Sequence, residues 1–236
     1  FFQAEHGIRD FCLSRGLGDV YKRQLDDHMF EAYLSQPKGK PKAGLVILQE
    51  IFGVNTHIQE ITNFFADQGY LAIAPSLFDR GERNVKLGYD EKSIKKGRGL
   101  KSLCDKNALK DIEAAISVVC SAGKVGVIGY CWGGSLSWRI ACENNKLSAA
   151  ICYYGGDIPN LKELEPKCNV LTHFGELDQG IPIESVRKFK EARPKVQTYT
   201  YPADHGFNCN HRRQYNETSS KVALDRSLRF LEKNLY

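Results

Sequence analysis

Short apolar runs alternate with segments of helical periodicity along most of the chain. Residues 43–48, Ala-Gly-Leu-Val-Ile-Leu, form a continuous apolar run, as a strand does when both of its faces are buried. Residues 56–68 follow with apolar side chains at helical spacing. The same alternation predicts strands at residues 70–74, 124–128, 149–153, 170–174 and 196–201, and helices at residues 106–121, 134–143, 182–192 and 216–234. Strands alternating with helices predict an α/β fold, a mostly parallel sheet with helices on both faces.

Two segments depart from this alternation. Residues 79–102 are polar and contain glycine, and we expect a loop with a short helix there. Residues 1–24 have no periodicity and no capped helix start, lack the apolar block of a signal peptide, and are similar to translated sequencing-adapter sequence. We therefore predict a non-native or disordered extension over residues 1–24 and a single domain over residues 25–236, since neither a repeat nor a linker interrupts the latter.

Composition and charge narrow the classes of function. The 236 residues are 42% hydrophobic and carry a net charge of +5 that is not gathered into a basic block. Nucleic acid is therefore not an expected partner. No apolar run approaches the roughly 20 residues that cross a bilayer, so no membrane partner is expected either. We expect a small molecule as the partner; the oligomeric state is unknown from the sequence, with a monomer as the starting expectation.

The cysteines are scattered through predicted helices and strands of a chain large enough to fold without disulfides. We expect them to be reduced, which fits a cytoplasmic location. No Cys-x-x-Cys motif and no His/Cys pair falls at zinc-ligand spacing, so neither a metal nor an organic cofactor is predicted. The eight residues are Cys12, Cys104, Cys120, Cys131, Cys142, Cys152, Cys168 and Cys209.

The strongest chemical signal lies between the strand at residues 124–128 and the helix that follows it. The sequence Gly129-Tyr-Cys131-Trp-Gly133 has the Gly-x-nucleophile-x-Gly pattern of a nucleophile elbow, with cysteine in place of the usual serine. Glycine is needed on either side because a Cβ there would clash with the neighbouring strand and helix. Such a turn places the sulfur above the sheet at a helix N-terminus, which favours the thiolate. Cys131 is therefore the candidate nucleophile.

A later acid and histidine complete the pattern. Asp178 follows the predicted strand at residues 170–174, and His205 follows the one at residues 196–201. The chain order nucleophile, acid, histidine is that of α/β-hydrolases. The carboxyl ends of parallel strands share one edge of a sheet, where such folds bind ligands. Asp204 is a rival for the acid, although its position next to His205 is poor for reaching the ring.

Four segments of the chain resemble the dienelactone hydrolase family. They are Gln49-Glu-Ile-Phe-Gly-Val-Asn55, Gly129-Tyr-Cys-Trp-Gly-Gly134, Gly175-Glu-Leu-Asp178 and Asp204-His-Gly-Phe207, and the resemblance runs from about Leu45 to the final helix. It implies an α/β-hydrolase fold and a triad of Cys131, His205 and Asp178. It also implies that Glu50 contacts the resting thiol and helps to deprotonate it, and that the backbone N–H groups of Ile51 and Trp132 form an oxyanion hole.

The resemblance implies that an arginine and a tyrosine bind the substrate carboxylate in the region matching residues 80–100, where this chain departs from the family pattern. Arg80, Arg83 and Arg98 are the candidates, and the sequence does not choose among them. Tyr153 is a candidate for lining the pocket, with packing in the core as the alternative.

Each assignment has a structural alternative. Cys131 could be a small buried residue in a glycine turn, His205 a loop-capping residue, Asp178 the cap of the next helix, and Glu50 a solvated charge at a strand end. The favoured hypothesis is hydrolysis of a carboxylic ester or lactone through a thioester acyl-enzyme. A redox-sensing or ligand-binding protein on the same fold is the first alternative, because a fold does not establish turnover. A broad esterase or thioesterase is the second.

Overall fold

The computed structural model describes residues 18–19, 22–23 and 28–236. Apart from two short strands, β1 (Gly18–Asp19) and β2 (Lys22–Arg23), the extension predicted over residues 1–24 lies outside the described residues, and so does Cys12. The two strands pair antiparallel with β4 (Ala32–Ser35) and β3 (Met29–Phe30), respectively. The sequence analysis missed β3 and β4, because runs of two and four residues are too short to show a period.

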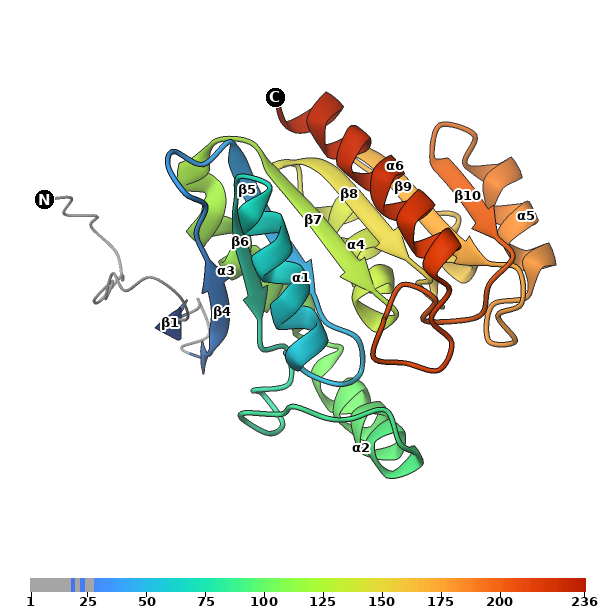
Figure 1. Cartoon of the computed structure of the whole chain (residues 1–236), viewed down its shortest axis with the longest axis horizontal. Coiled ribbons are helices and arrows are strands. Elements are labelled where there is room, and N and C mark those ends of the chain that lie inside the picture. The colour runs from blue at the N-terminus through green and yellow to red at the C-terminus, as the bar shows by residue number, and fades with distance from the viewer. Residues whose placement is uncertain (1–17, 20–21, 24–27) are drawn as a thin grey trace, which may run out of the picture.

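One mixed sheet forms the centre of the molecule (Figure 1). Its described strands lie in the order β1-β4-β6-β5-β7-β8-β9-β10, and the six from β6 to β10 are parallel. β5 is buried along its whole length, as its apolar run predicted. The strands of the parallel part are β5 (Ala43–Leu48), β6 (Tyr70–Pro75), β7 (Val125–Tyr130), β8 (Leu147–Tyr153), β9 (Asn169–Gly175) and β10 (Gln197–Tyr201).

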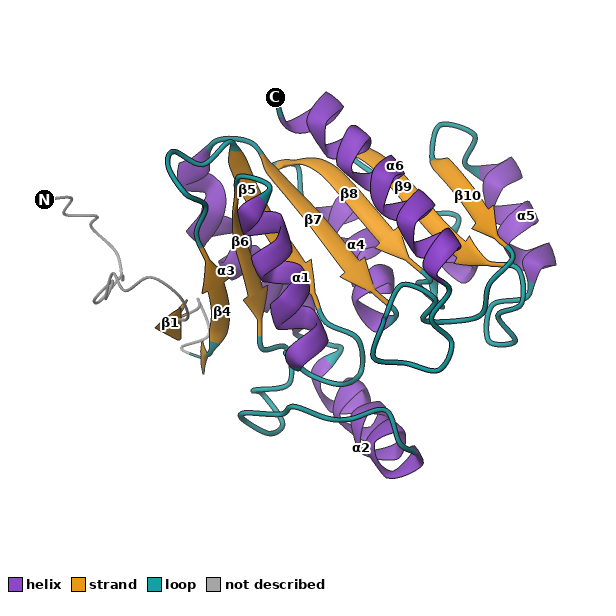
Figure 2. Cartoon of the chain, viewed as in Figure 1, coloured by secondary structure: helices purple, strands orange, loops and turns teal. Residues whose placement is uncertain are grey.

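Helices cover both faces of this sheet (Figure 2). α1 and α6 lie on the face toward the viewer in Figure 1, and α3 and α4 lie behind the strands. The α/β architecture is therefore the one that the alternation predicted. The helices are α1 (Thr56–Asp67), α2 (Glu91–Cys104), α3 (Ala108–Val119), α4 (Trp132–Glu143), α5 (Ile183–Ala192) and α6 (Glu217–Leu235), with two 3-10 turns, η1 (Cys120–Ala122) and η2 (Ile158–Leu161).

The region from residue 79 to 102 contains more helix than the sequence indicated. α2 has 14 residues, and its N-cap Asp90 accepts a hydrogen bond from the Ser93 N–H at 2.9 Å. Only Gly97, Leu100 and Cys104 are buried along it, which is why its sequence shows little apolar periodicity. Gly97 is required because a Cβ there would overlap the carbonyl oxygen of Ile51. α2 therefore lies directly against the strand end that carries Ile51.

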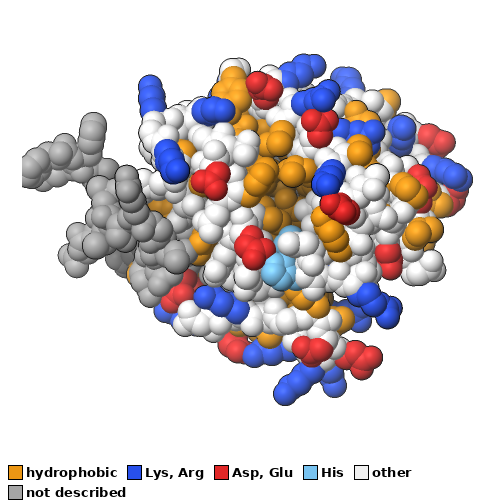
Figure 3. Space-filling view, viewed as in Figure 1, with side chains coloured by type: hydrophobic (Ala, Val, Ile, Leu, Met, Phe, Trp, Pro, Cys, Tyr) orange, Lys and Arg blue, Asp and Glu red, His pale blue; other side chains and the backbone are white. Residues whose placement is uncertain are grey.

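Three further features relate to the expectations from composition: the state of the cysteines, the hydrophobicity of the helices and the distribution of surface charge. The cysteines among the described residues are all free thiols. Within residues 28–236, none of the helices combines the length and the hydrophobicity that a bilayer crossing demands. On the face shown in Figure 3, basic and acidic side chains are interspersed, and hydrophobic side chains gather between α1 and α6.

A buried histidine ties β9 to β10 and α6. His173 is fully buried, its Nδ1 lies 2.7 Å from the Tyr201 hydroxyl, and its Nε2 lies 3.0 Å from the Ser227 hydroxyl. Burial lowers the pKa of His173 to about 3, and the Arg226 cation adds to this effect. The ring is therefore neutral in the folded protein over the ordinary pH range.

This pKa predicts that acidification destabilises the fold. Below a pH of about 6.5 the unfolded chain binds a proton at His173 that the folded chain does not bind. Between that pH and the folded pKa, the free energy of unfolding should therefore fall by about 1.4 kcal/mol per pH unit from this residue alone. Urea unfolding at pH 7 and pH 5 measures the free energy of unfolding of wild type and of His173→Asn. The decrease between the two pH values should be larger in wild type, and the difference between the two proteins gives the contribution of His173. Equal pH slopes for the two proteins would contradict it.

Candidate active site

Cys131 occupies a strained turn between β7 and α4. Its backbone has φ 56° and ψ −115°, a region that residues with a Cβ rarely adopt. A Cβ on Gly129 would overlap the carbonyl of Gly133, and a Cβ on Gly133 would overlap the carbonyl of Leu48. The two glycines are thus needed for the reason that the sequence pattern suggested. The turn holds the half-buried sulfur at the N-terminus of α4, where the helix dipole favours a negative charge.

His205 and Asp178 lie at the same edge of the sheet, in the loops after β10 and β9. His205 Nδ1 lies 2.6 Å from Oδ2 of Asp178, whose side chain is almost completely buried. The other oxygen, Oδ1, accepts a hydrogen bond from the Gly180 N–H at 2.8 Å, which fixes the plane of the carboxylate. The Cys131 sulfur and the His205 ring line the same cavity, and the sulfur lies close enough to raise the pKa of the ring. Sulfur, imidazole and carboxylate therefore lie together at the wall of one cavity.

These contacts set the charge of the imidazole. Burial alone lowers the pKa of His205, but the Cys131 sulfur and the hydrogen bond to Asp178 outweigh it and raise the pKa to about 10. The protonated ring is therefore favoured whenever the Cys131 sulfur carries a negative charge. An imidazolium beside a sulfur atom is the arrangement that stabilises a thiolate nucleophile.

A cavity of about 440 Å³ opens above these three residues. Ile51 and Trp132 both line it. Trp132 is the first residue of α4, so its N–H has no partner within the helix. Its indole is held by a 2.7 Å hydrogen bond from Nε1 to Asp105 and by stacking on Phe78. The remaining lining residues are Phe52, Ile94, Arg98, Lys101, Ser135, Gly156, Asp157, Gln179, Gly180, Asp204 and Arg212, besides the triad itself.

Glu50 is buried and forms an ion pair with Arg212, which lines this cavity. Its Oε1 accepts a hydrogen bond from Arg212 at 2.9 Å, and Oε2 has no hydrogen-bond partner among the described residues. The carboxylate of Glu50 is therefore paired with Arg212 in this structure. A half-satisfied buried carboxylate can form a further hydrogen bond at little cost, because one of its oxygens is already desolvated without a donor.

Comparison with known proteins identifies the family. The model described as the dienelactone hydrolase family matches residues 30–235 of the chain. The chain belongs to the dienelactone hydrolase family. A carboxymethylenebutenolidase from Pseudomonas putida is 35% identical over 221 residues, which cover 89% of this chain and 93% of that protein. The family and this relative make the chain a carboxylic ester hydrolase that acts on a small-molecule ester.

Solved structures show the same fold. A candidate dienelactone hydrolase from Klebsiella pneumoniae superposes with a TM-score of 0.80 and 28% identity, covering 92% of this chain and 98% of that chain. An esterase from Pyrococcus furiosus superposes with a TM-score of 0.70 over 97% of this chain and 98% of that chain; at 14% identity this match shows the fold alone. The predicted α/β-hydrolase fold and the predicted family are both confirmed.

Only one of the three candidate arginines of this hydrolase lines the cavity. Arg98, on α2, does so. Arg80 lies elsewhere and forms a bidentate pair with the buried Asp111, with a shortest distance of 2.8 Å. Arg83 donates a hydrogen bond to the carbonyl of Met29 at 3.1 Å. Tyr153 is buried, shares a 2.8 Å hydrogen bond with Ser227, and is not among the cavity-lining residues.

The sequence analysis missed Arg212 and Lys101, which line the cavity, and gave no clear place to Tyr154. The Tyr154 ring lies 5.0 Å from that of His205 and restricts its orientation. A tyrosine next to a predicted strand end gives no signal of this contact. Arg212 could have been noticed as a cation a few residues after His205, but nothing in the sequence pairs it with Glu50, 162 positions away.

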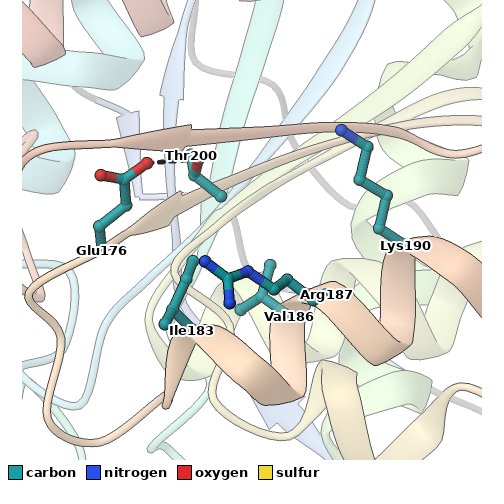
Figure 4. Close-up of a pocket in the computed structure, with 6 residues that line it drawn as sticks. All are labelled: Glu176, Ile183, Val186, Arg187, Lys190 and Thr200. Atoms are coloured by element: carbon teal, nitrogen blue, oxygen red, sulfur yellow. Dashed lines mark hydrogen bonds between the residues drawn. The ribbon is translucent and has the colours of Figure 1, made fainter.

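A second cavity of about 380 Å³ lies between the edge strand β10 and α5 (Figure 4). Glu176 and Thr200 form a 2.7 Å hydrogen bond at one side of it, and Arg187 and Lys190 extend from α5 at the other. None of its lining residues belongs to the constellation around Cys131. Cys131, His205 and Asp178 all line the first cavity instead.

Proposed function

We propose that this hydrolase cleaves a carboxylic ester or lactone through a thioester formed on Cys131, with His205 as the proton carrier and Asp178 as the group that orients it. The observation that carries the proposal is that Cys131 and the hydrogen-bonded pair of His205 and Asp178 line the same cavity, with the sulfur close enough to act on the ring. The strained turn and the start of α4 support it, since both present the sulfur to a ligand.

The proposed reaction has two stages. The thiolate of Cys131 attacks the carbonyl carbon, and the electron pair of the C=O bond moves to the oxygen. The N–H groups of Ile51 and Trp132 stabilise this oxyanion. When the C–O bond of the ester breaks, the departing alkoxide takes a proton from His205. Water then gives a proton to His205 and attacks the thioester, which releases the acid and restores the thiol.

Glu50 has a proposed role in the first stage. Its free oxygen has no donor in this structure, and its other oxygen depends on Arg212. A substrate carboxylate that binds Arg212 would compete for this cation. The carboxylate of Glu50 would then lose its cation and become the base that takes the proton of the Cys131 thiol, so that ionisation of Cys131 is coupled to substrate binding. Such coupling limits the time for which a reactive thiolate is open to oxidation.

The cavity favours an anionic substrate. Of its cations, Arg212 pairs with Glu50 and Lys101 pairs with Asp157 at 3.4 Å. Arg98 has no acidic partner within residues 28–236. An unpaired guanidinium at the cavity wall is suited to bidentate binding of a carboxylate. We therefore assign Arg98 as the group that recognises a substrate carboxylate.

Replacing Arg98 with glutamine should raise KM for an anionic lactone by roughly 10- to 100-fold, the equivalent of a charge-assisted hydrogen bond of about 1.5–3 kcal/mol. KM for a neutral aryl acetate should change little. Lys95→Gln removes a cation from the same helix outside the cavity and is the matched control. An equal effect of Arg98→Gln on both substrates would contradict the assignment.

The acyl-enzyme itself can be trapped. Brief incubation with an activated ester, acid quenching and mass measurement of the intact chain should show one added acyl group, and peptide mapping should locate it on Cys131. The adduct should be absent from Cys131→Ala. No adduct during turnover, or an adduct that persists in the alanine variant, would refute the thioester. A protein that is reversibly oxidised at Cys131 and turns over no ester would favour the redox-sensing alternative.

A further inference from the structure

A second cluster of ionisable side chains lies outside the cavity, where α1 meets the loop between β10 and α6. His57 and Glu60 are three positions apart on α1 and therefore lie on one side of the helix. His211, from the loop, places Nε2 2.7 Å from Oε2 of Glu60. One nitrogen or oxygen from each of the three residues lies within 4.8 Å of the others. Figure 1 shows the start of α1 and this loop at the same edge of the sheet.

His57 is the unusual member of this cluster. It is 4% exposed, yet neither ring nitrogen has a hydrogen-bond partner within the described part of the chain. The Asn210 side chain lies beside the ring, outside hydrogen-bonding geometry. A buried imidazole normally has at least one hydrogen-bond partner, since burying an unpaired polar group destabilises the fold. The ring of His57 lies 5.8 Å from that of His211, so its orphaned nitrogens adjoin the other two ligands.

The ligand atoms of this cluster are of the kind that bind a metal ion. Two imidazoles and one carboxylate are the ligands of three-coordinate protein sites for Zn²⁺ that leave a fourth position to water. Zn–N and Zn–O bonds of about 2.0–2.2 Å place tetrahedral ligand atoms roughly 3.4 Å apart. Nε2 of His211 and Oε2 of Glu60, which are 2.7 Å apart, would therefore separate slightly to admit the ion, and the ligand atom of His57 already lies within 4.8 Å of both. The side chains of His211 and Glu60 are 35% and 51% exposed, so they can move and an ion can enter from solvent.

We propose that His57, Glu60 and His211 form a binding site for a Zn²⁺ ion. The site is separate from the triad and joins α1 to the loop that carries His205 and Arg212. An ion bound there would cross-link the two segments and restrain the backbone next to Arg212. Because the ion would bind the folded chain only, it would raise the thermal stability of the protein.

A second, more deeply buried set of candidate ligands also includes His57 but is less suited to binding the ion. Glu50, His57 and Cys209 also bring ligand atoms within 4.8 Å of one another, and all three are buried. Glu50 is already paired with Arg212, and Cys209 is hydrogen-bonded to Tyr89 at 3.2 Å. Burial keeps Cys209 in its protonated form, and a metal requires the thiolate. The outer set of ligands is therefore the one that we assign.

The experiment uses the full chain with Cys131→Ser, which prevents Zn²⁺ from binding to a thiolate in the triad. Calorimetric titration with Zn²⁺ should show one site per chain. His211→Ala and Glu60→Gln should each weaken the affinity by roughly tenfold or more, since even outer-shell changes cost 10- to 100-fold. Glu184→Gln removes an exposed helical carboxylate on α5 and should leave the affinity unchanged. At about 100 times Kd, Zn²⁺ should raise Tm by roughly 5–10 °C in the parent protein, and this rise should disappear in the two ligand variants.

Spectra with Co²⁺ distinguish the two sets of ligands. The outer site offers only nitrogen and oxygen, so Co²⁺ should give ligand-field bands without a thiolate charge-transfer band, and Cys209→Ser should not change them. The proposal is overturned by any of three results: no saturable Zn²⁺ binding to the parent protein, an affinity that neither ligand variant lowers, or a charge-transfer band that Cys209→Ser abolishes.

Discussion

Cys131→Ala should lower kcat/KM for an activated ester by roughly 10⁴- to 10⁶-fold, the loss seen when the nucleophile of a catalytic triad is removed. Alanine has no atom that can bond to the carbonyl carbon, so the thioester stage is lost as a whole. The residual rate comes from binding and the oxyanion-stabilising N–H groups alone. Steady-state kinetics with an aryl ester measure the effect.

The control separates chemistry from folding. Cys131 is only half buried and sits in a turn whose shape is set by the flanking glycines, so alanine should leave Tm within about 2 °C of wild type. Cys120→Ala, at an exposed position far from the cavity, should retain full activity. Substantial hydrolysis by Cys131→Ala, at a rate within tenfold of wild type, would mean that another group forms the acyl-enzyme.

The position of the nucleophile could be predicted because its signal is local. The strand, the turn and the helix around Cys131 are consecutive in sequence. Gly129 is required by its contact with Gly133, and Gly133 by its contact with Leu48 on the neighbouring strand β5. Asp178 and His205 could be predicted because each follows a buried strand, and parallel strands bring their carboxyl ends to one edge. Chain order and strand periodicity were therefore sufficient to predict that Cys131, Asp178 and His205 lie at one edge of the sheet.

Which residues surround Cys131, His205 and Asp178 cannot be predicted from local sequence patterns. Arg80 and Arg98 are equivalent in the sequence, and only the course of α2 shows that one is paired with Asp111 while the other lines the cavity. α2 was itself underestimated, because a helix that buries three side chains has a weak period.

The cluster of His57, Glu60 and His211 was missed for a related reason. Zinc-ligand spacing in a sequence detects ligands that are close along the chain. Here His211 comes from the loop before the last helix and His57 from the first helix, and only the parallel sheet brings them together. The sequence analysis therefore predicted no metal site, and the cluster is recognised only from the three-dimensional arrangement.

Asp178→Asn should lower kcat by roughly 10²- to 10⁴-fold while leaving KM within a few-fold of wild type. An asparagine at this position can donate its amide N–H to Nδ1 of His205, which favours the tautomer with the proton on Nε2. That tautomer cannot accept a proton from the sulfur or from water. The pKa of His205 should also fall, because the substitution removes the negative charge that stabilises the imidazolium. The pH–rate profile should therefore shift along with the loss of rate.

Asp204→Asn is the matched control, since it removes the rival carboxylate. Oδ1 of Asp204 accepts a hydrogen bond from the backbone N–H of its neighbour His205 at 2.6 Å, whereas the ring of His205 is bonded to Asp178. Asparagine retains an oxygen that can accept this bond, so kcat should fall less than about tenfold and the pH–rate profile should keep its shape. If Asp204→Asn instead matches the loss caused by Asp178→Asn, the orientation of His205 does not depend on the Asp178 carboxylate alone, and the assigned role of Asp178 is contradicted.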